Sequence, residues 1–122
     1  MENFNYPEQI ERASLDLAGV QREAATLRER LAEIEAILTL EIINAKTPEG
    51  KPLYSNEAAR NAELIRRLKD NEDAVEIKRM LERADERRAG LLAHVERSRG
   101  EFKLFLLDRQ AEITAHGAPH LS

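Results

Sequence analysis

A heptad repeat near the start of the chain limits most strongly what it can fold into. Apolar residues follow one another in unbroken alternating steps of three and four, the spacing of a coiled-coil seam. The seam consists of Ile10, Ala13, Leu17, Val20, Ala24, Leu27, Leu31, Ile34 and Leu38. An apolar seam that repeats every 3.5 residues stays in contact with one partner helix only if the two helices supercoil left-handedly. The pattern predicts a helix over about 7–45 that packs along another helix.

A second heptad repeat supplies that other helix. It consists of Ile77, Leu81, Ala84, Arg88, Leu91, Val95, Ser98, Phe102 and Phe105. We expect a helix over about 72–116, ended by Gly117 and Pro119, and a frayed tail over 117–122. Arg88 is expected to extend its charged end to water, and His94, beside the seam, to be partly buried in packing.

Between the repeats, two prolines and a glycine predict a loop over 46–55. A short helix over about 56–70 follows, with Ser55 or Asn56 as its N-cap. Asp70 or Asn71 either breaks or kinks the chain before the long helix. The predicted inner face of the short helix consists of Ala58, Ala59, Ala62, Ile65 and Leu68. We expect this face to cover the stretch from Ile37 to Ile43, which is apolar all round.

These elements predict one all-α domain: a long antiparallel coiled-coil hairpin with a short helix after the turn, completed by oligomerisation. The composition agrees, because charged residues make up 34% of the 122 residues and aromatic residues only 4%. Long, solvated helices with a narrow apolar stripe have such a composition.

Several apolar side chains lie off the seams, and exposing them would leave patches of a kind that usually mark interfaces. We therefore predict self-association, most simply a homodimer, with a higher oligomer or an unknown protein partner as alternatives. The predicted contact residues are Leu15, Leu40, Ile43, Leu92, Leu104 and Leu107. The preferred role of Phe102, Phe105, Leu106 and Leu107 is core packing against the start of the first helix, beside Phe4 and Tyr6, and the alternative role is binding of a partner.

The chemistry of an enzyme is not apparent in the sequence. It contains no cysteine, no glycine-rich phosphate loop and no Glu-x-x-His pair. Gly117 and Pro119 interrupt the spacing of Glu112, His116 and His120, so no metal site is predicted. We predict no catalytic residue, no cofactor and no membrane partner, and a cytoplasmic location, because neither a secretory signal nor an apolar run long enough to cross a bilayer is present.

A basic run lies around the turn, although the formal net charge of the chain is -4. It consists of Lys46, Lys51, Arg60, Arg66, Arg67 and Lys69. One interpretation is contact with nucleic-acid phosphates. The preferred interpretation is that these bases offset the acidic first helix on which they pack.

The segment Pro52-Leu53-Tyr54-Ser55-Asn56-Glu57, with Arg60 one turn later, resembles small uncharacterised helical-hairpin proteins of phages, prophages and bacterial genomes. The likeness continues through Asp70-Asn71-Glu72 to Glu101-Phe102-Lys103. Such proteins are often encoded near recombination or replication functions, and no activity is assigned to them. This chain departs from them at Asp73-Ala74-Val75, where they tend to have a proline and an aromatic residue.

Together these features predict a non-enzymatic, oligomeric coiled-coil interaction protein. The resemblance adds a phage-derived or DNA-recombination setting. The alternative is a weak single-stranded nucleic-acid binder that uses the basic turn region.

Overall fold

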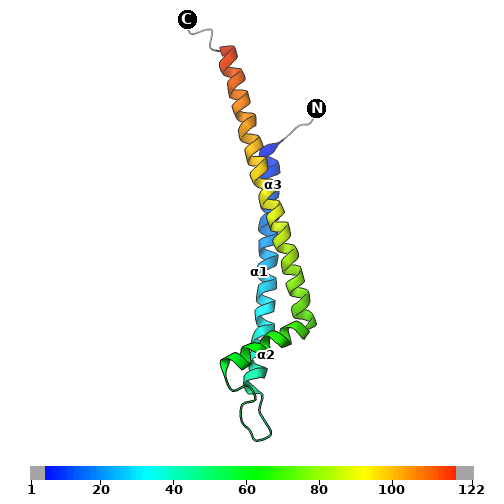
Figure 1. Ribbon diagram of the computed structural model, residues 1–122. Coiled ribbons are helices and arrows are strands. Elements are labelled where there is room, and N and C mark those ends of the chain that lie inside the picture. Colours follow the sequence, from blue (N-terminus) through cyan, green and yellow to red (C-terminus); the bar gives the residue numbers. More distant parts are fainter. Residues whose placement is uncertain (1–4, 118–122) are drawn as a thin grey trace. The chain divides into compact units, whose positions relative to one another are not determined.

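The computed structural model describes residues 5–117 of the chain, and this part consists of three helices. In chain order they are α1 (Tyr6–Asn44), α2 (Glu57–Asp70) and α3 (Glu72–Gly117) (Figure 1). Within the described range, strand-like pairing is limited to an isolated bridge between Lys46 and Pro52. The all-α class predicted from the sequence is therefore confirmed. The predicted frayed tail lies, from residue 118 on, outside the described residues.

The chain divides into two compact units, which are described separately. The central unit is Gln21–Glu86 and contains the end of α1, the loop, all of α2 and the start of α3. The terminal unit is Met1–Val20 with Arg87–Ser122, and contains the start of α1 and most of α3.

The core of the central unit is a narrow line of apolar side chains from all three helices. Its buried members are Ala24, Leu27, Ile42, Leu68, Ala74, Ile77 and Ala84. Leu31, Ile34 and Leu38 of the first seam are half-buried. At the edge of this core, Arg28 of α1 lies 3.9 Å from Asp85 of α3. Both side chains are largely exposed, so this ion pair contributes little to stability.

The core of the terminal unit combines small residues with an aromatic cluster. Ala13, Val20, Val95 and Ser98 are its buried members. The ring of Tyr6 stacks on Phe102 with 5.7 Å between centroids and lies 5.9 Å from the ring of Phe105. Phe4, expected in the same cluster, lies outside the described residues.

The aromatic end of α3 is less buried than the sequence suggested. Phe105 is 44% exposed, and Leu106 and Leu107 are each 50% exposed. α1 begins at Tyr6, which already lies against Phe102 and Phe105, so the described part of α1 provides no residue for the following turns of α3. His94, expected to be partly buried, is exposed, and Arg88 is exposed as predicted.

The short helix is rotated relative to its predicted orientation. Ile65 is 57% exposed, and Ala58 and Ala62 are exposed as well. The buried residues of α2 are Glu63 and Leu68. α2 therefore covers the apolar end of α1 only in part. Ile42 is buried, but the apolar side chains on the other faces of α1 are exposed. The exposed ones are Ile37, Leu40 and Ile43.

Two asparagines define the ends of α2. The side chain of Asn56 accepts a hydrogen bond from the backbone N–H of Ala59 at 2.7 Å, so Asn56 is the N-cap. Asn71 has an extended backbone, and its N–H donates to the carbonyl of Leu68 at 3.4 Å. Its side chain accepts from the N–H of Ala74 at 2.9 Å. Asn71 therefore ends α2 and caps α3, which makes the junction a break rather than a kink.

We predict that Asn71→Ala lowers the free energy of unfolding by about 1 kcal/mol, because it removes the oxygen that caps α3. Asn61→Ala is the matched control, since Asn61 is exposed in the middle of α2, where alanine suits a helix. Urea unfolding followed by circular dichroism, at one protein concentration, measures both variants. Equal stability of the two variants would contradict a capping role for Asn71.

Candidate functional site

The most distinctive polar feature of the central unit is the buried carboxylate of Glu63 on α2, whose side chain is only 9% exposed. One carboxylate oxygen accepts a hydrogen bond from the hydroxyl of Tyr54. The other accepts from the guanidinium of Arg66, one turn along α2. Because an unpaired buried carboxylate is strongly unfavourable, these donors are what allow Glu63 to occupy an inner position.

Arg67 connects the same carboxylate to the first helix. Its guanidinium lies 3.9 Å from Glu63 and 3.5 Å from Glu41 of α1. It also lies 6.0 Å from the centre of the Tyr54 ring, a cation–π distance. Arg67 is only 25% exposed, so these contacts are screened less than a surface ion pair would be. Loop, α2 and α1 are thus joined through one polar cluster.

The segment before α2 is held in place by its own hydrogen bonds. Gly50 has φ of 83°, a conformation that favours glycine, and its N–H donates to the carbonyl of Thr47 at 2.9 Å. At the other end of the loop, Arg60 donates to the carbonyl of Tyr54 at 3.3 Å. The backbone at Tyr54 is therefore tied to α2, which places the phenol beside Glu63.

The environment of Glu63 lowers the pKa of its carboxyl group. The main cause is the hydrogen bond from Arg66, followed by the one from Tyr54, and burial acts in the opposite direction. The same contact with Glu63 raises the pKa of Arg66. Glu63 therefore stays ionised in the folded protein to more acidic pH than an ordinary glutamate.

The six predicted phosphate-contact residues all lie in the central unit, but they divide into two groups. The three arginines have internal partners: Arg60 donates to the loop, Arg66 donates to Glu63 and lies 3.2 Å from Asp70, and Arg67 forms ion pairs with Glu63 and Glu41. The other group consists of the exposed lysines Lys46, Lys51 and Lys69.

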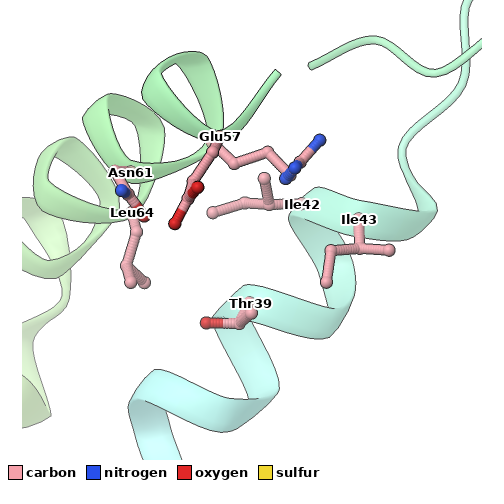
Figure 2. Close-up of a pocket in the computed structure, with 7 residues that line it drawn as sticks. Thr39, Ile42, Ile43, Glu57, Asn61 and Leu64 are labelled. Carbon is pink, nitrogen blue, oxygen red and sulfur yellow. The ribbon is translucent and has the colours of Figure 1, made fainter. Parts of the chain in front are cut away.

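A shallow groove of about 240 Å³ lies between α1 and α2. Figure 2 shows it with Ile42 and Thr39 contributed by α1 and Leu64 contributed by α2. The other lining residues are Ile43, Glu57, Arg60 and Asn61. The volume is below that of a usual small-molecule site, and the lining combines apolar, polar and charged side chains.

The predicted contact leucines and isoleucine are distributed over both units. In the central unit, Leu40 is 60% exposed and Ile43 is 48% exposed. In the terminal unit, Leu15, Leu104 and Leu107 are 65%, 63% and 50% exposed. Leu92 is half-buried.

Two features of the site were not anticipated from the sequence. Glu63 was not singled out, because a glutamate in a helix rich in charge is ordinarily interpreted as a solvated residue. The nearest available signal was Tyr54, a phenol just before the helix, which needs a hydrogen-bond partner when half-buried. The second feature is the outward position of Ile65. It follows from the inward position of Glu63, because the two residues lie on opposite sides of α2.

Groups of acidic, histidine or cysteine side chains suited to a metal ion are not found in the described part of the chain. The side chain of His116 and all of His120 fall outside that part. The helices within residues 5–117 also lack the combination of length and apolar character needed to cross a membrane.

We predict that acidification destabilises the protein through Glu63. Because its folded-state pKa is lowered, its contribution to stability is complete above the ordinary glutamate pKa of about 4.3 and is lost as the pH falls through the lower folded-state value. Glu63→Gln should therefore reduce stability at neutral pH and reduce its dependence on pH below about 5. Thermal unfolding between neutral and acidic pH measures both effects. Glu49→Gln, at an exposed loop position, is the control, and an identical pH profile for the two variants would contradict the role of Glu63.

Comparison with known proteins does not assign the chain to a family. No protein-family model matches it, and no significant match to it was found among curated proteins or solved structures. The resemblance of the segment around Tyr54 to phage and prophage proteins therefore stays a prediction.

Proposed function

We propose that this chain is a non-enzymatic, homo-oligomeric coiled-coil protein that holds a protein partner. The observation that carries the proposal is the number of large apolar side chains exposed in both units, nearly all of them on helices. They are Leu15, Ile37, Leu40, Ile43, Leu53, Ile65, Leu104, Phe105, Leu106, Leu107 and Ile113. Single exposed apolar residues are ordinary, but several within two turns of one helix are typical of interfaces.

We infer that α1 and α3 form the antiparallel coiled-coil hairpin expected from the two heptad repeats. Contacts inside each unit support this. In the terminal unit the start of α1 contacts the later part of α3, through Tyr6 and Phe102. In the central unit the later part of α1 contacts the early part of α3, through Arg28 and Asp85. Such a pattern of contacts is expected of helices that run in opposite directions.

The alternative function, weak binding of single-stranded nucleic acid, rests on the exposed lysines Lys46, Lys51 and Lys69. It has less support, because the three arginines of the basic run bind partners within the chain. An arginine held between Glu63 and Glu41 would have to leave these carboxylates before it contacted a phosphate.

A phage-derived or DNA-recombination setting, and a cytoplasmic location, complete the proposal. The setting rests on the resemblance of residues 52–57 and Arg60 alone. Three residues of that motif have clear structural roles, since Tyr54 bonds Glu63, Asn56 caps α2 and Arg60 bonds the carbonyl of Tyr54. Because the resemblance implies a genomic setting and no activity, the genes that flank this one are the best test of it.

We predict that the protein self-associates at micromolar concentration. Size-exclusion chromatography with light scattering should give at least twice the monomer mass of 13.9 kDa. A mass of one chain at all concentrations up to about 100 μM, well above a micromolar Kd, would overturn the homo-oligomer.

We also predict that the chain does not bind single-stranded oligonucleotides at low salt. Fluorescence anisotropy with a labelled oligonucleotide at two salt concentrations tests this. Binding that weakens steeply with salt, and that is removed by charge reversal at Lys46, Lys51 and Lys69 together, would favour the alternative function. Charge reversal at exposed Lys78, Arg83 and Lys103 is the matched control.

A further inference from the structure

The outward face of α2 carries an apolar stripe that ends in a positive charge. Its residues are Ala58, Ala62, Ile65 and Lys69, in steps of four, three and four. All four are exposed, and Ile65 is 57% exposed. This spacing places them along one line of the helix, because a residue advances by about 100° in a helix of 3.6 residues per turn. We call this line the α2 stripe.

The outward face of α1 carries the matching arrangement. Its residues are Glu33, Ile37, Leu40 and Asn44, again in steps of four, three and four. All four are exposed, with Ile37 at 58% and Leu40 at 60%. Ile43, 48% exposed, borders the line. We call it the α1 stripe; it begins with a negative charge and continues as apolar surface.

The two stripes complement each other when their helices run in opposite directions. Glu33 then lies opposite Lys69, Ile37 opposite Ile65, Leu40 opposite Ala62, and Asn44 opposite Ala58. The small alanines leave room for the large Leu40, as in ridges-into-grooves packing. One acidic and one basic side chain meet at the same end, so the apolar contacts and the charges select the same register.

The stripes of one chain cannot meet each other. α1 and α2 of one chain already contact each other through different faces. Arg67 lies against Glu41 there, and Ile42 and Leu64 line the same groove. In Figure 2, Leu64 and Ile42 both lie on the sides of their helices that border this groove. Ile65 and Lys69 do not line this groove, and Lys69 instead borders a groove between α2 and α3. An α1 stripe that packs on them must therefore come from another molecule.

We propose that the α1 stripe of one copy packs antiparallel on the α2 stripe of a second copy. This rests on the proposed homo-oligomer and names its interface. The two stripes face away from each other across the α1–α2 pair, so one copy meets two neighbours and the contact is heterologous, as in a ring or an open chain of copies. A nucleic acid suits this surface less well, because Glu33 would repel phosphates at the end where the stripes must meet. The interface includes Leu40, one of the residues predicted from the sequence as contacts.

Charge reversal at the paired ends tests the proposal. Glu33→Lys and Lys69→Glu each place like charges together at the interface and should each raise the Kd for self-association on the order of tenfold, measured by sedimentation velocity. Both residues are exposed, so circular dichroism should show unchanged helix content. Glu86→Lys and Arg83→Glu, exposed positions of the same unit outside both stripes, are the matched controls and should leave the Kd unchanged.

An equimolar mixture of the two single variants provides the decisive measurement. Where Glu33→Lys and Lys69→Glu copies alternate in an assembly, the introduced lysine of one copy meets the introduced glutamate of the next. The native pair of Glu33 with Lys69 re-forms at the following contact. The mixture should therefore recover wild-type affinity, and so should the double variant.

Two outcomes separate this interface from the homo-oligomer on which it rests. If the wild type self-associates but neither single variant weakens it, or the mixture stays weak, this interface is wrong and the homo-oligomer stands. If the wild type is a monomer, both proposals fail.

Discussion

The narrowness of the apolar seams is the constraint on which the rest of this structure depends. The buried apolar residues are few, and many of them are alanine or valine, such as Ala24, Ala74 and Val95. Small side chains let helices approach closely, but each removes little apolar surface from water. Stability must then accumulate over many turns, because a short helix has little stability of its own. This explains helices of 39 and 46 residues in a chain of 122.

The central unit supplements its thin core with a buried polar cluster. Glu63 occupies a position on α2 where an apolar side chain would ordinarily pack. Its charge is balanced by Arg66 and Arg67, and the hydroxyl of Tyr54 donates a hydrogen bond to it. A buried charge needs its donors in fixed places, so such a cluster favours one rotation of α2 over others. Glu41 adds the contact that relates this rotation to α1. Apolar packing alone, with one leucine buried on α2, would define the rotation less well.

The sequence predicted the parts of the fold that follow from local rules. The all-α class followed from the two heptad repeats, and a cap at Ser55 or Asn56 followed from the preference of helix starts for a side-chain oxygen; the structure has it at Asn56. The rotation of α2 could not be predicted in this way. Periodicity assigns the apolar line through Ile65 to the core, whereas the structure buries Glu63 instead. The assignment fails because it considers the apolar residues of one helix by themselves, and the partners of Glu63 come from the next turn of α2 and from the loop.

The two unusual features of α2 have a common origin. The rotation that brings Glu63 to Tyr54 also turns Ile65 to the surface, because the two residues lie on opposite sides of the same helix. In a chain that acts alone, this would be an unfavourable choice, with a charge inside and an isoleucine outside. In an assembly whose copies use the outward stripe as an interface, both sides of α2 are buried, one by polar contacts within the chain and one by apolar contacts between chains. The polar cluster then has a role beyond the stability of one chain, since it holds α2 in the orientation that presents Ile65 and Lys69 to a second copy.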